Sequence, residues 1–204
     1  MKLILLIVLT CAISYLLGCL NAAYFYSMNV KKTDIREYGS GNAGSTNILR
    51  VFGLKSALPV FAVDVLKAVA AIRLSIWITG GNPIAVILSG LFVILGHNWP
   101  IFMQYRGGKG VASSLGIMFA LDYRVALILL CVAVLTMLIS RMVSLGSVVG
   151  LTVAPFVMWG INGKIEYIIM AAVLAAMGIF QHRTNLVRIA KGEENKFGKK
   201  KTDQ

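Results

Sequence analysis

Long apolar stretches separated by short polar segments dominate this chain. A helix that crosses a bilayer needs about 20 mostly apolar residues, and the sequence contains candidates at 3–26, 54–78, 84–103, 124–140, 143–161 and 165–181. A shorter stretch, 111–121, would rise only about 16 Å as a helix, roughly half of the hydrocarbon core. It predicts a short crossing helix or a re-entrant segment buried against its neighbours. Counted as a crossing, it completes a bundle of about seven transmembrane helices.

The composition agrees with an all-α integral membrane protein. The 204 residues are 58% hydrophobic and 14% charged, with a mean hydropathy of +0.80, whereas a soluble domain carries about 25% charged residues. We expect residues 1–190 to form a single polytopic membrane domain. Residues 191–204 are polar and basic, which predicts a disordered cytoplasmic tail. The start of the chain resembles a signal peptide after Lys2, but the apolar stretch continues to Tyr26, which predicts a retained span.

The basic residues predict the orientation of the bundle. If loop 31–53 is cytoplasmic and every segment crosses, the cytoplasmic side holds most of the 20 Lys and Arg residues: Lys31, Lys32, Arg36, Arg50, Lys55, Arg106, Lys109, Arg141, Arg183, Arg188, Lys191, Lys196, Lys199, Lys200 and Lys201. This excess supports an N-out, C-in topology with seven passes. It also accounts for the net charge of +12 without a nucleic-acid partner, and we expect none.

Residues 39–50 form a polar segment between two apolar stretches. Its start, Gly-Ser-Gly-Asn-Ala-Gly, matches G-x-G-x-x-G, but no predicted strand precedes it and no βαβ unit surrounds it, which argues against a dinucleotide fold. Glycines let backbone N–H groups approach an anion, and a helix beginning within 45–47 would add its N-terminus. The alternative is a flexible turn. Because Thr46 and Arg50 would share one helical face, we favour a phosphate cradle at the membrane surface.

Two further polar clusters would lie on the same face. The loop Arg106-Gly107-Gly108-Lys109-Gly110 packs one lysine among three glycines, which is typical of an anion site, although a basic membrane anchor is the alternative. The last apolar stretch ends in His182-Arg183-Thr184-Asn185, with Arg188 following. A histidine among arginines suits phosphate binding, and the alternative is contact with lipid headgroups by long basic side chains.

The remaining polar residues point away from metal and acid–base chemistry. Asp64 and Lys67 are three residues apart inside an apolar stretch, and we interpret them as a structural ion pair; His97 we interpret as a satisfied buried histidine. The three cysteines lack metal-ligand spacing, and we expect no metal or cofactor. With few acidic residues, the predicted site binds phosphate without paired carboxylates, which suits acyl transfer from an activated donor to a phosphorylated acceptor.

Four motifs occur in order along the chain: Gly39–Arg50, then Gly96-His97-Asn98-Trp99-Pro100 running to Gly107–Ala112, then Ser144-Leu145-Gly146-Ser147, then His182, Asn185 and Arg188. With these motifs the chain resembles the bacterial membrane glycerol-3-phosphate acyltransferases that use acyl phosphate as donor. Gln104-Tyr105-Arg106 and Ser113 depart mildly from the family pattern. The resemblance implies a seven-span bundle in the bacterial inner membrane, with its site on the cytoplasmic face. It also implies acyl transfer from acyl phosphate to the 1-hydroxyl of sn-glycerol 3-phosphate, giving lysophosphatidate.

The resemblance also implies residue roles. Catalytic roles fall to Ser40, Lys109, His182 and Asn185, and substrate-binding roles to Gly41, Asn42, Gly44, Thr46, Asn47, Arg50, Gly107, Gly108, Ser147 and Arg188. The donor's own phosphate is the favoured base, and His182 is the alternative. Functional coupling to the enzyme that makes acyl phosphate would fit this role.

Two other function classes stay open on the sequence alone. A transporter for an anionic solute would also place broken helices at an anion, but it would need polar residues continuing to the outer side. A non-catalytic binder of lipid headgroups would not need His182 and Asn185 close to Ser40.

Overall fold

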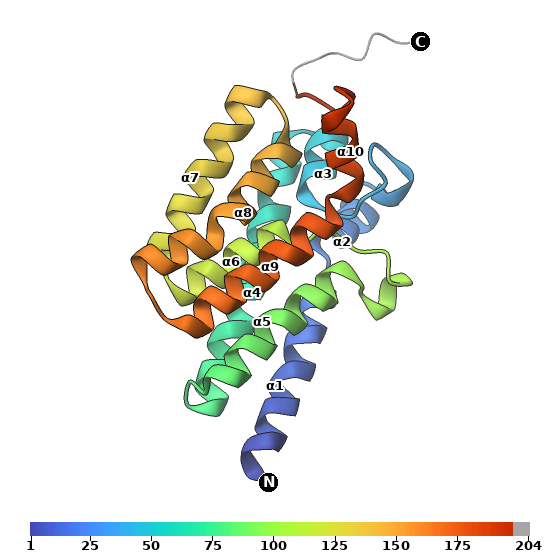
Figure 1. The fold of residues 1–204 in the computed structure, drawn as a ribbon. Coiled ribbons are helices and arrows are strands. Elements are labelled where there is room, and N and C mark those ends of the chain that lie inside the picture. Colours follow the sequence, from blue (N-terminus) through green and yellow to red (C-terminus); the bar gives the residue numbers. More distant parts are fainter. Residues whose placement is uncertain (198–204) are drawn as a thin grey trace.

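The computed structural model describes residues 1–197, and every regular element in this range is helical (Figure 1). In chain order the elements are α1 (Lys2–Cys19), α2 (Ala22–Val30), η1 (Ile35–Glu37), α3 (Ser45–Phe52), α4 (Leu54–Thr79), α5 (Pro83–Asn98), η2 (Ile101–Met103), α6 (Val111–Leu121), α7 (Tyr123–Ser140), α8 (Val143–Ile161), α9 (Ile165–Gln181) and α10 (Arg183–Ala190). The all-α class predicted from the sequence is confirmed.

Four to five segments are long and apolar enough to cross a membrane. Four qualify on their own: Lys2–Val30, Pro83–Met103, Tyr123–Ser140 and Val143–Ile161. A fifth forms if α9 and α10, bent by 62° at their junction, count as one. α4 has 26 residues but carries four charged side chains, and α6 is short. The predicted span 3–26 is interrupted, because α1 ends at Cys19 and the side chain of Asn21 accepts a hydrogen bond from Tyr24 N to start α2.

Small residues let the helices approach closely. α1 packs along α5, where Gly18 and Gly96 face each other, and a Cβ on Gly18 would lie 2.9 Å from Gly96 Cα. Such contacts replace hydrophobic association inside a bilayer, where lipid is as apolar as the side chains. α7 packs on α8, and α8 on α9, to form the other side of the bundle (Figure 1).

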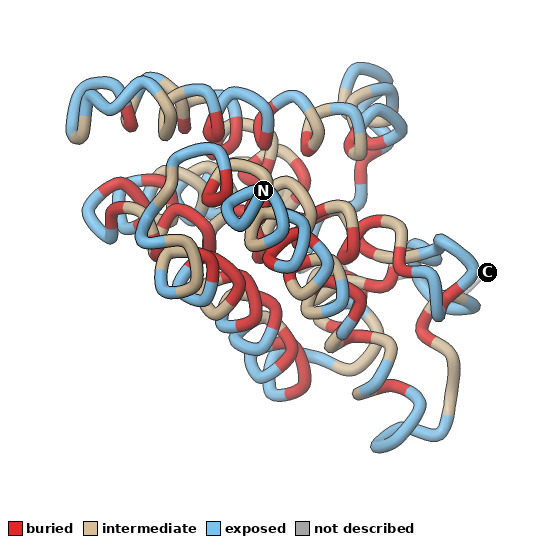
Figure 2. Tube along the Cα trace, turned by 90° about the horizontal axis from the view of Figure 1, so that it is seen from below, coloured by how far each residue is buried: buried red, intermediate tan, exposed pale blue. Residues whose placement is uncertain are grey.

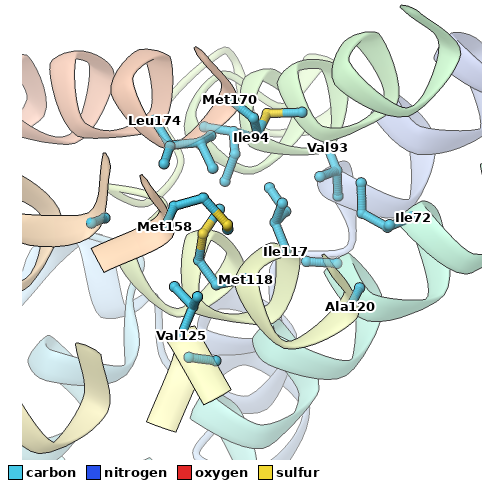
Figure 3. Packing of buried hydrophobic residues seen from close by; sticks show 14 of the residues in the cluster. Ile72, Val93, Ile94, Ile117, Met118, Ala120, Val125, Met158, Met170 and Leu174 are labelled. Atoms are coloured by element: carbon cyan, nitrogen blue, oxygen red, sulfur yellow. The ribbon is translucent and has the colours of Figure 1, made fainter. Parts of the chain in front are cut away.

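The core lies between these helices and consists of aliphatic side chains and methionines. Ile72, Val93, Ile117, Met158 and Met170 are each almost fully buried and meet at its centre (Figure 3). Large apolar side chains also cover the outside, and Trp77 and Ile139 are 81% and 85% exposed. Figure 2 shows buried positions on the facing sides of the helices and exposed positions on the outer sides. An outer surface this apolar is that of an integral membrane protein.

The polar loops gather at one end of the bundle. α2, α3 and α10 lie away from the N-terminus, whereas the α4–α5 turn lies on the same side as the N-terminus (Figure 1). The sequence predicts disorder for 191–204, but the structure describes 191–197 and buries Glu194 to 6% exposure. The prediction for 198–204 lies outside the described residues.

Candidate active site

The side chain of Asn47 organises the first polar loop. Its Oδ1 accepts a hydrogen bond from Ser40 N at 2.9 Å, and its Nδ2 donates to Ile35 O and Tyr38 O at 3.1 and 2.9 Å. Gly39 has φ +61°, and a Cβ there would overlap Asn47 Oδ1. The sequence predicts that Asn47 binds substrate, whereas the structure shows its amide bonding the loop backbone and fixing the position of Ser40.

Helix α3 begins where the first loop ends. The prediction of a helix starting within 45–47 is confirmed, because α3 starts at Ser45 with Gly44 as its N-cap. No side chain caps this helix. Ser45 and Thr46 therefore bring the N-terminus of α3, with its partial positive charge, to the site. Arg50 lies on the next turn of the same helix and is exposed.

The second loop is bonded to the end of α5. Gly107 N donates to Asn98 O at 3.1 Å, and Gly108 N donates to His97 O at 3.0 Å. The sequence predicts that these glycines bind phosphate, but their amides already have partners and neither residue lines the polar cavity described below. From this loop, Lys109 and Gly110 line that cavity.

Lys109 connects the second loop to the third cluster. Its Nζ donates to Asn185 Oδ1. Asn185 Nδ2 in turn donates to Glu194 Oε1 at 2.7 Å, and Ser144 Oγ donates to the same oxygen at 2.9 Å. Arg188 Nε donates to Glu194 Oε2 at 2.9 Å. Glu194 therefore accepts from three donors, one on α8 and two on α10.

Burial sets the protonation of the site. His182 Nδ1 is 2.7 Å from Gly178 O, and since a carbonyl can only accept, Nδ1 carries the proton and Nε2 keeps its lone pair. Burial, aided by the charge of Lys109, lowers the pKa of His182 to about 4. Burial, aided by Arg188, lowers the pKa of Lys109 to about 8. At pH 7 the histidine is neutral and the lysine is mostly protonated.

One polar cavity brings the three clusters together. The predicted site residues that line it are Ser40, Asn42, Gly44, Thr46, Asn47, Arg50, Lys109, Ser147, His182 and Asn185. Gly41, Gly107, Gly108 and Arg188, also predicted for the site, do not line it. The other polar residues and the glycine that line the cavity have no catalytic or substrate-binding role in the sequence prediction: Ser45, Asp64, His97, Gly110, Ser144, Glu194 and Asn195.

An apolar cavity adjoins the polar one. The two share Val111 and Ser147, and the apolar cavity continues between the helices along Met118, Leu151 and Leu174. Within residues 1–197, no group of three or more His, Cys, Asp or Glu side chains is placed to hold a metal ion. The arrangement can hold an anion beside an apolar chain.

Comparison with known proteins gives one consistent answer. The family model described as glycerol-3-phosphate acyltransferase matches residues 8–192. A glycerol-3-phosphate acyltransferase of Thermoanaerobacter pseudethanolicus is 42% identical over 196 residues, covering 95% of this chain and 96% of that protein. One of Clostridioides difficile is 40% identical over 198 residues, covering 95% and 97%.

Solved structures agree. A crystal structure of PlsY (YgiH), an integral membrane glycerol 3-phosphate acyltransferase in its glycerol 3-phosphate form, superposes with a TM-score of 0.87 at 32% identity. It covers 97% of this chain, and 96% of that chain is matched. The lysophosphatidic acid form of that enzyme gives a TM-score of 0.86. With the sequence, the fold and the polar cavity in agreement, this chain belongs to the glycerol-3-phosphate acyltransferase family.

Proposed function

We propose that this enzyme transfers a fatty acyl group from acyl phosphate to the 1-hydroxyl of sn-glycerol 3-phosphate. The hydroxyl oxygen attacks the carbonyl carbon, and the bond from that carbon to the phosphate oxygen breaks. Inorganic phosphate leaves with the hydroxyl proton, and 1-acyl-sn-glycerol 3-phosphate (lysophosphatidate) remains. Family membership favours this reaction over the transporter and the headgroup binder.

One observation carries the proposal: the polar cavity, lined by Arg50 and Lys109 together with the carboxylates of Asp64 and Glu194, adjoins an apolar cavity and shares Val111 and Ser147 with it. Acyl phosphate likewise combines a polar and an apolar part, an anionic head and an apolar chain. The acceptor is a second phosphate compound, and two basic side chains, Arg50 and Lys109, line the polar cavity. A mixed anhydride is already activated, so holding the hydroxyl near the carbonyl supplies much of the acceleration.

The site residues divide between the two substrates. Ser40, Thr46 and the N-terminus of α3 hold the donor phosphate, and Lys109 stabilises the charge that develops as phosphate departs. Arg50, Ser147 and Asn185 hold the acceptor. The neutral Nε2 of His182 accepts a hydrogen bond from the attacking hydroxyl. The departing phosphate takes the proton, and His182 is the alternative acceptor.

The proposal includes seven passes in the bacterial inner membrane. In this proposal α4 and the short α6 add two crossings to the five apolar segments. The excess of basic residues then assigns the polar cavity to the cytoplasmic face and the N-terminus to the outside. Because acyl phosphate is reactive, the enzyme that makes it would supply it directly.

Lys31→Cys and Lys164→Cys, each in a chain without its natural cysteines, test the topology. An impermeant maleimide added to intact cells should label position 164 and leave position 31 unlabelled; the reverse pattern contradicts the orientation.

Phosphate release by purified enzyme tests the reaction. Detergent-solubilised protein receives palmitoyl phosphate with and without glycerol 3-phosphate, and palmitoyl-CoA serves as the parallel donor. We expect phosphate release that depends on the acceptor and matches lysophosphatidate formed, with no product from the thioester. Product from palmitoyl-CoA alone would reject acyl phosphate as the donor.

A further inference from the structure

Three buried ionisable side chains meet beside the active site without an assigned part in the reaction. Lys67 Nζ lies 2.7 Å from Asp64 Oδ1 and 2.9 Å from His97 Nδ1. Asp64, Lys67 and His97 are 1%, 6% and 3% exposed. A buried ion pair contributes little net stability on its own, because desolvation offsets the attraction. This cost, and a location against the polar cavity, point to a role beyond holding helices together.

Lys67 donates hydrogen bonds to the backbone at the break between α1 and α2. Besides its ionic partner, its Nζ donates to Gly18 O at 3.1 Å and to Leu20 O at 2.9 Å. These carbonyls belong to the last turn of α1 and the residue that follows it, where helical hydrogen bonding ends. The next residue, Asn21, donates from Nδ2 to Ala43 O at 2.9 Å and so holds the first polar loop.

The imidazole of His97 packs against the second polar loop at Gly108. A Cβ on Gly108 would overlap His97 Nε2 and would lie 2.9 Å from Ala43 O. Gly108 is therefore held between the imidazole and the carbonyl that Asn21 holds. The contacts form a closed ring that runs from Lys67 through Leu20, Asn21, Ala43, Gly108 and His97 back to Lys67.

We infer that this ring is a positioning device, in which the Asp64–Lys67–His97 cluster and Asn21 fix the two polar loops against each other and thereby place Lys109. Lys109 directly follows Gly108, so a shift of the loop moves the ammonium relative to the donor phosphate. A misplacement of about 1 Å costs on the order of 100-fold in rate. If the Asp64–Lys67 ion pair served stability alone, the His97 imidazole that contacts Lys67 would not need to lie against Gly108.

His97→Asn isolates this contact. The shorter side chain can still accept from Lys67 Nζ through its Oδ1, in place of Nδ1, but it leaves the space beside Gly108 empty. Ser89→Ala is the matched control, because Ser89 lies on the same helix, is fully buried and has no hydrogen-bond partner among the described residues. His97→Gln, whose amide reaches the Nε2 position, is the conservative rescue.

Thermal melting, hydrogen exchange of the peptide that contains Gly107 and Gly108, and turnover are measured together. We expect His97→Asn to melt within a few degrees of Ser89→Ala, to exchange faster at this peptide only, and to lose turnover about 10- to 100-fold. His97→Gln should recover part of both losses. Unchanged exchange and turnover in a folded His97→Asn protein would overturn the proposal, and so would exchange that accelerates equally throughout the bundle.

Asn21→Ser tests the opposite side of the ring and keeps the inference decidable if His97→Asn does not fold. Serine still caps α2 but is too short to reach Ala43 O. It should reproduce the faster exchange at Gly107 and Gly108, and a folded Asn21→Ser protein with normal exchange would reject the ring. Only the turnover readout rests on the proposed function. If wild-type enzyme makes no product from acyl phosphate, the donor assignment fails while hydrogen exchange still decides the positioning role.

Discussion

Replacing Glu194 with glutamine tests whether a single buried carboxylate holds the third cluster in place. Its side chain is 2% exposed, and it accepts from Ser144 and Asn185 through one oxygen and from Arg188 through the other. Glutamine keeps one acceptor oxygen for Ser144 and Asn185. Its amide group then meets Arg188 Nε, donor against donor, and one charge-assisted hydrogen bond is lost.

The magnitude follows from these contacts. A hydrogen bond to a charged group contributes about 1.5–3 kcal/mol, and the Arg188 side chain is 36% exposed, so water replaces part of what is lost. We expect a loss of about 1–2 kcal/mol in the free energy of unfolding. For a chain of this size that lowers the melting temperature by roughly 2–8 °C. Turnover should fall as well, because Asn185 connects Glu194 to Lys109.

Thermal melting in detergent and acyl transfer on the same preparations provide the assay. Glu193→Gln is the matched control, since its side chain is exposed and the same charge is removed one residue away. If Glu194→Gln and Glu193→Gln melt and turn over alike, the carboxylate does not organise the site. The pKa of Glu194 lies below its usual range because its hydrogen-bond donors outweigh burial, so the wild-type contribution should persist at pH 6.

Other substitutions and conditions test the remaining roles. Lys109→Met should keep the fold and lower turnover about 100- to 1,000-fold; near-normal turnover would remove Lys109 from the mechanism. The pKa values of His182, about 4, and Lys109, about 8, predict activity that rises as the histidine deprotonates and falls as the lysine loses its charge. Turnover that does not change between pH 7 and 9.5 would contradict the role of charged Lys109. Arg50→Ala should raise KM for glycerol 3-phosphate about 10- to 100-fold, checked by acceptor titration. Ala154→Leu should narrow the apolar cavity and shift the donor preference from palmitoyl to lauroyl phosphate, measured as a ratio of kcat/KM; an unchanged ratio would place the acyl chain elsewhere.

The helices could be predicted from the sequence because a bilayer imposes a local rule. A stretch of apolar residues must form a helix to satisfy its own backbone, whatever the rest of the chain does. This rule does not predict the break in the helix after α1. Asn21 looks like one polar residue in an apolar run, and its effect depends on contacts with Tyr24 and Ala43 that hydropathy does not record.

The site could be predicted only where a residue's role is local. The start of α3 at Ser45 follows from the glycines before it. The sequence predicts a disordered tail around Glu194, because its neighbours are polar and two of its hydrogen-bond partners are 50 and 9 residues away. The i, i+3 pairing of Asp64 and Lys67 was visible in the sequence and is confirmed, whereas the contact of Lys67 with the end of α1 was not visible.

The structure requires these glycines for a different physical reason from the one that the motif suggests. The pattern predicts amides aimed at phosphate, but Ser40 N, Gly107 N and Gly108 N donate to the protein itself. What these loops require of glycine is absence of a side chain, because a Cβ at Gly39 would overlap Asn47 and one at Gly108 would overlap His97. In the proposed mechanism, phosphate is then recognised by side chains and by the N-terminus of α3. A substitution at either glycine should therefore act by displacing the loop rather than by removing a phosphate ligand.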